Sequence, residues 1–480
     1  MKYIIRIVSI IIITTTLFAQ NNFNCFSIIA GKNCTVDGSV LFGHNEDDSG
    51  DQIVNIYKVP RLTHTNDEKI TLLNGGKCQQ VPETNAYIWL EMPGMKFSDG
   101  YLNEYNVVIA SDNCPSKEDK PELTDGGIGY WLRRLMAERA KSAREAVEIG
   151  GKLVEKFGYD SPGRSYCIAD PNEAWVMSVV NGKHWVAQRV PDDKVMIIPN
   201  YYMIQEIDLS DSDNFMGSTD IIDYAVSRGW YNPQEDDEFN FREVYGIDWS
   251  INHTHNINRQ WGGLRLIAKD KFDMNDNFPF AMTPKKKLDV SDIFAVLRDH
   301  YEGTDLENID HSLSPHKTET RTICTHSTQY GFVAQLQSNL PKEIAGVMWY
   351  APVQPCLHPF VPVYINTMEF SPFFAHEDYK TGLELHFDEN YAELKKEFER
   401  HHFQEFTEFS HKVNEDYKKY SLPIIKHYSL YEKEQITKHK EYAKLIKRAF
   451  NEDPSLALDI MTEYSQENLF KLLDTQFIQK

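Results

Sequence analysis

The sequence predicts an α+β fold in which sheets are covered by helices. Short apolar segments with strand composition recur between residues 25 and 351, and many are apolar on both faces, which is typical of sheets covered by helices rather than water. Residues 387–480 are instead rich in lysine, glutamate and aromatic residues with helical spacing. At 480 residues and 41% hydrophobic, the chain could form two or three domains, or one large domain with a helical appendage.

The first twenty residues have the form of a secretory signal. Lys2 and Arg6 give a basic start, an apolar run extends from Ile7 to Ile13, and the segment leads to Ala19. The apolar run, which three threonines follow, is too short to span a membrane. No later stretch approaches about 20 apolar residues. We therefore expect an exported protein, secreted or periplasmic.

Residues 25–48 predict a β-hairpin directly after this leader. FSIIAG has the composition of a buried strand, VDG that of a turn, and SVLFGHN that of a second strand. Ten later segments also predict strands: 87–92, 106–111, 166–170, 174–180, 184–190, 195–200, 263–268, 322–327, 330–336 and 345–351.

Two regions predict helices. From residue 127 to 157, apolar residues recur at helical spacing with arginine and glutamate opposite, which indicates one amphipathic helical region with a solvated face. Near the C-terminus, Leu394, Phe398, Phe406 and Phe409 form a stripe typical of a packed core or docking face. Pro423 and Pro454 are expected to separate about three helices there.

Charge and motifs exclude several classes of partner. A formal net charge of −21 opposes binding to phosphate backbones and anionic lipid, so neither nucleic acid nor membrane is expected. Gly126-Gly127-Ile128-Gly129 lacks the strand and spacing of a nucleotide loop, and no H-E-x-x-H or C-x-x-C motif occurs. The histidines, among them His300 and His316, have no ligand spacing along the chain, so neither a cofactor nor a metal is expected.

The seven cysteines are an odd number for an exported chain. If six of them pair, 15 connectivities are open, and one thiol must stay free. Cys25 is the natural candidate because cleavage before it would place a thiol and a free α-amine on one residue. The amine, with an ordinary pKa of about 7.7–8.0, could then accept the thiol proton and produce a thiolate nucleophile.

The segment CFSIIAGKNCTVDGSVLFGHNEDD resembles the amino-terminal signature of the cysteine-type dipeptidase family that includes dipeptidase A and the secernins. Further similarity lies in YLNEYNVVIASDN, LMAERAKSAREAVEIGGKLVEKFGY, ADPNEAWVMSVVNGKHWVAQRVPDD and QLQSNLPKEIAGVMWYA, so it covers roughly residues 25–370. The resemblance implies an N-terminal nucleophile hydrolase with a four-layer αββα fold. The expected organisation is a signal peptide at 1–20, a short propeptide at 21–24, the hydrolase domain at 25–380 and a helical region at 381–480.

The resemblance also implies roles for five residues. Cys25 would be the nucleophile, Asp47 would orient its amine, and Asn200 would donate to the oxyanion. His44 stands where many relatives have arginine, which makes the local charge pH-dependent. Arg259 is the nearest counterpart of a second arginine, with Arg265 close behind in the sequence.

The function expected from these residues is an exported cysteine dipeptidase that exposes Cys25 by processing and acts on a dipeptide or another small amide. Glu46, Asp48 or Glu104 could recognise a substrate ammonium. Two alternatives stay open: an N-acyl amide hydrolase similar to penicillin acylases or bile salt hydrolases, and a non-catalytic binding relative. A homo-oligomer is also open.

Overall fold

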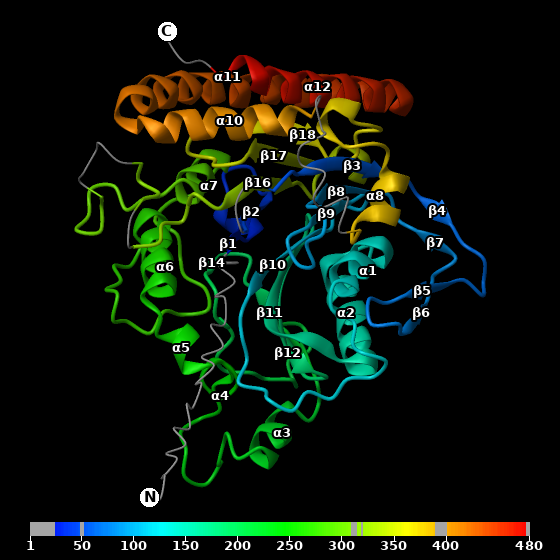
Figure 1. Cartoon of the computed structure of the whole chain (residues 1–480), viewed down its shortest axis with the longest axis vertical. Helices are drawn as coiled ribbons and strands as arrows, with labels where there is room; N and C mark the ends of the chain where they lie inside the picture. The colour runs from blue at the N-terminus through cyan, green and yellow to red at the C-terminus, as the bar shows by residue number, and fades with distance from the viewer. Residues whose placement is uncertain (1–24, 49–51, 309–313, 318–319, 389–400, 477–480) are drawn as a thin grey trace, which may run out of the picture.

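The computed structural model describes residues 25–48, 52–308, 314–317, 320–388 and 401–476. The expected signal peptide and propeptide therefore lie outside the described residues. Two large antiparallel sheets face each other, and helices cover both outer faces (Figure 1). The predicted four-layer αββα arrangement with a C-terminal helical region is confirmed.

The first sheet, called sheet I, has six strands in the order β14-β1-β2-β16-β17-β18. Its strands are β1 (Phe26–Ala30), β2 (Val40–Asp47), β14 (Val195–Ile198), β16 (Thr328–Leu336), β17 (Gly346–Pro352) and β18 (Val361–Tyr364). The predicted hairpin lies at its centre, with Phe26 paired to Asn45 and Ala30 to Leu41. The connection contains a short 3-10 turn (Lys32–Cys34) and Gly38, whose φ of 78° favours glycine.

The second sheet, sheet II, has eight strands in the order β15-β13-β12-β11-β10-β9-β8-β3. They are β3 (Asn55–Val59), β8 (Tyr87–Glu91), β9 (Gly100–Asn103), β10 (Val108–Asn113), β11 (Tyr159–Ala169), β12 (Ala174–Gly182), β13 (Trp185–Val190) and β15 (Phe215–Gly217). Two small two-stranded sheets project beside it: β4 (Leu62–Thr63) with β7 (Glu83–Thr84), and β5 (Lys69–Thr71) with β6 (Lys77–Gln79).

Side chains point alternately to the two faces of sheet I along β1, so this strand contributes to the hydrophobic cores on both faces. Phe26 and Ile28 point outward into a core that includes Leu264 of helix α6 (Thr254–Ile267), whereas Ile29 points inward toward sheet II. The inner core combines both sheets, with members such as Phe42, Ile29, Leu90, Val108 and Val176. Because strands buried on both faces need apolar residues at successive positions, FSIIA reads as a continuous apolar run interrupted only by Ser27.

Different helices cover the two outer faces. Helices α1 (Trp131–Arg139) and α2 (Ala143–Phe157) pack on sheet II, while α6 (Thr254–Ile267) and α7 (Val290–Leu297) pack on sheet I. Gly43 of β2 lets α7 approach closely, since a Cβ there would lie 2.5 Å from a methyl carbon of Ile293. Short helices α3 (Ile221–Ser227), α4 (Phe241–Tyr245), α5 (Asp248–Ile251) and α8 (Tyr379–Leu385) and the 3-10 turns Lys342–Ile344 and Pro372–Phe374 occupy connections.

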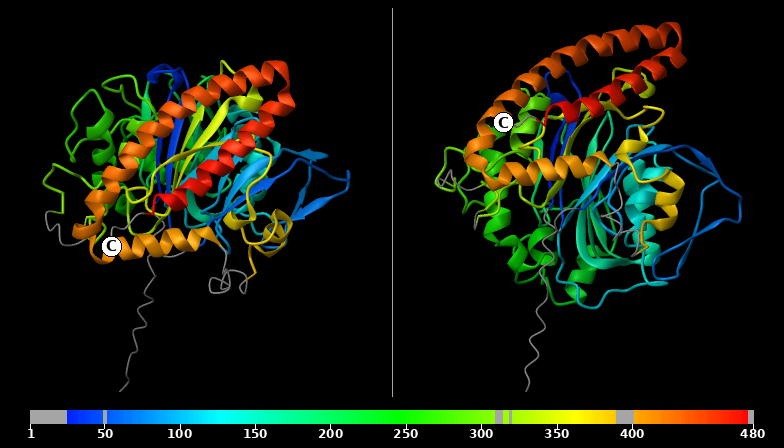
Figure 2. Two further views of the ribbon diagram at one scale, coloured as in Figure 1. Left: turned by 90° about the horizontal axis from the view of Figure 1, so that it is seen from above. Right: turned by 45° about the horizontal axis from the view of Figure 1, so that its top comes forward.

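The C-terminal helical region consists of α10 (His402–Glu415), α11 (Tyr417–Glu452) and α12 (Pro454–Asp474). Helix α12 packs on the edge strand β18, and α11 lies against α12, as the orange and red helices in Figure 2 show. Pro454 begins α12 as predicted, but Pro423 lies inside α11, so the prediction of a helix break there is wrong. The carbonyl that Pro423 leaves without a donor belongs to exposed Lys419, where water can satisfy it.

Two further predictions from local pattern are wrong, and a third region is helical as predicted but interrupted. Residues 263–268 lie in α6 rather than a strand, because their short apolar run continues a helical stripe that begins earlier. Residues 322–327 form a loop in which Thr325 and Ser327 bond to each other and to nearby backbone groups. The helical region 127–157 is divided in two, because the Ser142 side chain caps α2 by accepting from the backbone N–H of Glu145.

All seven cysteines lie in the described part of the chain, and each is a buried free thiol. The set of disulfides considered for an exported chain is therefore not formed in this structure. No helix in the described ranges combines the length and the apolar character needed to cross a bilayer.

Candidate active site

Strand register places three polar residues at one level of sheet I. Ser27 pairs with Ile198 of β14, and Phe26 pairs with Asn45 of β2. One residue further toward the N-terminus, Cys25 therefore lies between Asn200, which follows β14, and Glu46 on β2. The nucleophile predicted from sequence is thus at the end of the central strand, 1% exposed, on the side that faces sheet II.

The predicted residues around Cys25 are joined by direct contacts. The Cys25 thiol lies 2.8 Å from Glu46 Oε1 and 3.8 Å from the Asp47 carbonyl oxygen. Arg259 of α6 donates to the Cys25 carbonyl at 3.0 Å and to Asn200 Oδ1 at 2.6 Å. The fold therefore brings Cys25, Asp47, Asn200 and Arg259 into one buried cluster.

Arg259 and Arg265 were both candidates for the second arginine, and their positions differ. Arg259 is fully buried, and its guanidinium reaches the cluster. Arg265 lies nearly two turns further along α6 and pairs with Asp299 instead. Position on the helix therefore separates two arginines that the sequence left close together.

Asn200 presents a donor toward the same region. Its Oδ1 accepts from Arg259, which fixes the orientation of the side-chain amide. Its Nδ2 is buried and has no hydrogen-bond partner among the described residues. Because buried amide donors are almost always paired, this N–H group is available to a substrate oxygen.

Asp47 is held by residues outside the β1–β2 hairpin. Its carboxylate accepts from Arg321 at 2.8 Å and from Thr328 at 2.6 Å. Burial raises the pKa of Asp47, although the nearby Arg321 opposes that rise. Arg321 could not be predicted from local sequence, because the loop that contains it meets β2 only in the folded chain.

A directed chain of hydrogen bonds leads from the thiol to sheet II. Ser27 donates to Asp112 at 2.7 Å, so the Ser27 oxygen accepts from His44 Nδ1 at 2.8 Å. His44 Nε2 is then an acceptor, and Glu46 Oε2 lies 3.1 Å from it. Glu46 must carry a proton to donate there, while its Oε1 accepts from Cys25. The order is Cys25, Glu46, His44, Ser27, Asp112.

The pKa values agree with this direction. Burial raises the pKa of Glu46 to about 8 and lowers that of His44 to about 4, so the acid is protonated and the imidazole neutral near pH 7. The expectation that His44 makes the local charge pH-dependent is therefore wrong over the physiological range. Burial raises the pKa of Asp112 to about 6. Burial, followed by the neighbouring carboxylates, raises the pKa of the Cys25 thiol well above its ordinary value.

Several cluster residues were missed or left open at the sequence level. Ser27 and Asp112 are polar residues within buried strands, and polar residues in a segment with buried-strand composition are the local signal that could have drawn attention to them. Of the three acids considered for substrate recognition, Glu46 contacts the thiol and buried Asp48 accepts from Ser98 at 2.6 Å. Glu104 lies elsewhere, paired with Arg61 at 2.8 Å.

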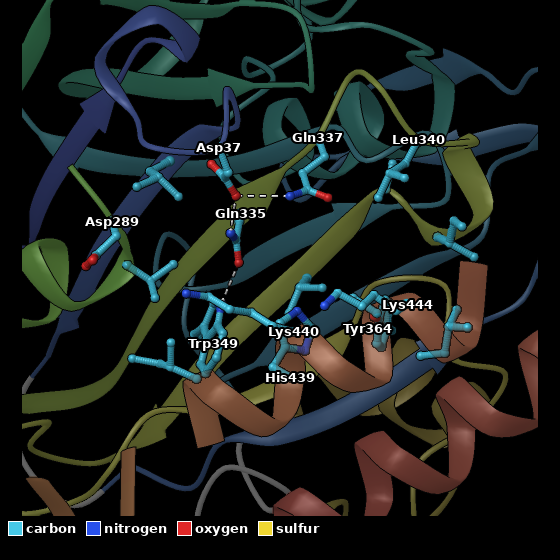
Figure 3. Close-up of a pocket in the computed structure, with 18 of the residues that line it drawn as sticks. Asp37, Asp289, Gln335, Gln337, Leu340, Trp349, Tyr364, His439, Lys440 and Lys444 are labelled. Carbon is cyan, nitrogen blue, oxygen red and sulfur yellow. Dashed lines mark hydrogen bonds between the residues drawn. The ribbon is translucent and has the colours of Figure 1, made fainter. Parts of the chain in front are cut away.

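A large cavity lies at the opposite end of the hairpin. It has a volume of about 480 Å³ and lies between the outer face of sheet I and α11, with Asp37, Gln335, Trp349, His439 and Lys440 among its lining (Figure 3). Leu41, also in the lining, is five residues along β2 from Glu46, or about 17 Å at 3.4 Å per residue. The cavity is thus separate from the Cys25 cluster.

A buried cysteine lies at the head of a central strand inside an αββα sandwich, and polar side chains from several elements surround it. Residues 24–416 match the model of peptidase family C69, which is more than half of the chain. The chain belongs to peptidase family C69, and the resemblance found in the sequence is confirmed.

Relatives in the curated proteins support this membership. A probable dipeptidase from Latilactobacillus sakei is 30% identical over 355 residues, which span 71% of this chain and 74% of that protein. A dipeptidase from Bifidobacterium longum is 27% identical over 386 residues, which span 71% of each chain. A probable dipeptidase B from Lactococcus lactis is 25% identical over 343 residues, spanning 68% of this chain and 71% of the relative.

Solved structures give weaker similarity. A penicillin V acylase from Agrobacterium tumefaciens matches with a TM-score of 0.34 and 11% identity, covering 71% of this chain and 86% of that chain. A conjugated bile acid hydrolase variant from Clostridium perfringens has a TM-score of 0.34 and 14% identity, covering 71% and 92%.

Proposed function

We propose that this chain is an exported cysteine dipeptidase whose nucleophile is Cys25 after removal of the preceding residues. Membership of a peptidase family and relatives named dipeptidases support the reaction class. The observation that carries the proposal is the arrangement at Cys25: a buried thiol 2.8 Å from Glu46, beside an Asn200 amide N–H that has no partner among the described residues.

Processing is the first step of the proposed mechanism. Hydrolysis of the peptide bond between residues 24 and 25 converts the Cys25 amide nitrogen into an α-amine. In the uncleaved chain, burial and nearby carboxylates raise the thiol pKa, which keeps the sulfur protonated and unreactive. An α-ammonium beside the sulfur adds a positive charge and opposes that rise. Cleavage would thus activate the nucleophile through local charge.

The catalytic cycle then follows from the proposed roles. The α-amine takes the thiol proton, and the thiolate attacks the scissile carbonyl to form a carbon–sulfur bond. Asn200 Nδ2 donates to the oxyanion, while Arg259 fixes the Asn200 side chain. As the carbon–nitrogen bond breaks, the ammonium protonates the leaving amine. Water hydrolyses the thioester and restores the Cys25 thiol. Asp47 orients the amine from the end of β2.

The polarity around Cys25 favours a substrate with a charged end. Glu46, which is protonated near pH 7, and Asp47, which is paired with Arg321, are both buried beside Cys25. A dipeptide carries an α-ammonium group close to its scissile bond, whereas an N-acyl substrate presents an apolar chain there. Polar rather than apolar side chains beside the nucleophile therefore support the dipeptidase over the N-acyl amide hydrolase.

Two measurements on the secreted chain test the proposal. End-sequencing and intact mass should show that the mature protein begins at Cys25, and a substrate panel should show turnover of free dipeptides but not of N-acyl amino acids. A Cys25→Ala variant is the matched control for background hydrolysis. An active protein that begins at Gln20 or Asn21 would contradict the mechanism, and preference for N-acyl substrates would contradict the substrate class.

A further inference from the structure

A second group of buried, chemically reactive side chains lies outside the Cys25 cluster. It comprises His300, His316, Cys324 and Cys356, and their ligand atoms all lie within 4.8 Å of one another. We propose that these four side chains bind one structural zinc ion, which fastens the loops behind the nucleophile.

The four residues come from four separate segments. His300 follows α7, His316 lies in the segment 314–317, Cys324 precedes β16, and Cys356 follows β17. All four are buried, with exposed fractions of 6%, 7%, 0% and 3% respectively. A closed site that supplies four nitrogen and sulfur ligands is typical of structural zinc, whereas catalytic zinc keeps an open position.

The distances fit a tetrahedron around zinc. Zn–N bonds of about 2.0–2.1 Å and Zn–S bonds of about 2.3 Å give N···N edges of about 3.3 Å and N···S edges of about 3.6 Å. The Nε2 atoms of His300 and His316 are 3.2 Å apart. His316 Nε2 lies 3.7 Å from the sulfur of Cys324 and 3.3 Å from that of Cys356.

The other nitrogen of each imidazole already has an oxygen partner. His300 Nδ1 lies 2.9 Å from the Glu302 carboxylate. His316 Nδ1 lies 3.3 Å from Asn414 Oδ1, and Asn414 is fixed in that orientation because its Nδ2 donates to Gln354. Metal-binding histidines usually have such outer partners, which fix the tautomer.

These partners leave the inner nitrogens of both imidazoles directed at one point. The Nε2 atoms of His300 and His316 lie 3.2 Å apart, a separation that a bound cation would bridge. Two cysteine sulfurs border the same point. A zinc ion accepts all four lone pairs, and two thiolates neutralise its charge. An S₂N₂ donor set favours zinc over calcium or magnesium, which prefer oxygen.

The site lies directly behind the Cys25 cluster. Arg321, three residues before Cys324, binds Asp47. Asn45, the β2 residue beside Glu46, donates to the backbone carbonyls of Leu297 and Ile323, which flank the same loops. The zinc ligands would therefore position Arg321 and Asn45 without touching substrate.

A Cys324–Cys356 disulfide is the competing state of these residues, especially in an exported protein. It would remove both thiolates and leave the two histidines facing each other. The two states differ in mass, in thiol count and in bound metal, so one preparation distinguishes them.

The test begins with metal analysis of the full chain purified without chelator. We expect one zinc per chain and two thiols at Cys324 and Cys356 that react with alkylating reagents only after unfolding with chelator. Cys324→Ser and Cys356→Ser should each lose the zinc, whereas Cys78→Ser, at a buried cysteine in β6, should retain it.

Cobalt substitution covers the case in which the serine variants fail to fold. Wild-type chain loaded with Co²⁺ should show sulfur-to-cobalt charge-transfer absorption and tetrahedral d–d bands. A metal-free chain that takes up no zinc, or a Cys324–Cys356 disulfide in the native protein, would overturn the proposal.

Discussion

The protein contains two buried clusters around cysteine residues, and the side chains that surround the cysteines differ between them. Around Cys25 the neighbours are carboxylates and arginines, a donor on Asn200 has no partner among the described residues, and hydrogen bonds lead away to Asp112. Around Cys324 and Cys356 the neighbours are imidazoles whose outer nitrogens are already bonded.

The difference shows what each environment can do. Buried carboxyl groups with raised pKa values and a buried donor that has no partner among the described residues cost folding free energy, and such features concentrate where a substrate binds. A closed set of nitrogen and sulfur ligands has no room for substrate and contributes to stability instead. The Cys25 cluster is therefore suited to catalysis, and the cluster of His300, His316, Cys324 and Cys356 to stabilising the fold. The loop that contains Arg321 connects the two.

The largest expected effect separates the two clusters by activity. Cys25→Ala should lower kcat/KM for a dipeptide by at least ~10³-fold, because no other group in the cluster can form the thioester. Circular dichroism should be unchanged. Cys78→Ala is the matched control and should retain activity. Appreciable turnover by Cys25→Ala would show that another residue is the nucleophile.

The second effect separates them by stability. Cys324→Ser should lower the free energy of unfolding by ~3 kcal/mol or more, since the energy of binding a structural metal is folding free energy. Chemical denaturation with and without added chelator measures this loss. Wild type should be sensitive to chelator and Cys324→Ser insensitive. An equal loss of stability on adding chelator to wild type and to Cys324→Ser would contradict a structural metal at this cluster.

The third effect tests the unpaired donor. Asn200→Ala should lower kcat by ~10²–10³-fold with little change in KM, because a donor to the oxyanion acts mainly in the transition state. Steady-state kinetics on one dipeptide measures both constants. Asn252→Ala, at an exposed asparagine nearby in the sequence, is the control. A change confined to KM would make Asn200 a residue of substrate binding.

The fourth effect concerns protonation of Glu46. Its folded-state pKa of about 8 lies above the ordinary 4.5, so it contributes stability that is fully present below about pH 4.5 and lost as the pH rises through about 8. Glu46→Gln mimics the protonated acid. The melting temperature of wild type should therefore fall relative to this variant between these pH values. Parallel melting curves across the range would show that Glu46 is ionised in the fold.

The smallest effect concerns the cavity under α11. Lys440→Ala alters its lining but lies far from Cys25, so kcat/KM for dipeptides should change by less than ~2-fold. A large loss of activity would show that substrate also uses that end of the hairpin.

Site residues could be predicted from the sequence where they lie close together in the chain. The hairpin, Cys25 and Asp47 come from one continuous segment, and its turn and strand patterns suffice to predict the pairing. Arg259 was harder, since sequence placed Arg265 beside it and only the rotation of α6 distinguishes them. The same limit explains residues 263–268, whose short apolar run fits a strand or a helix equally well.

The sequence by itself determined the layered α+β architecture, because strands with apolar residues on both faces require helices over them. It also determined the family, through the segment that contains Cys25 and Asp47. Only the tertiary structure decided that His44 is neutral, that Glu46 bears a proton and that Arg321 reaches Asp47. It alone gathered His300, His316, Cys324 and Cys356. Desolvation and ligand geometry arise from residues far apart in the chain, so no local spacing encodes them.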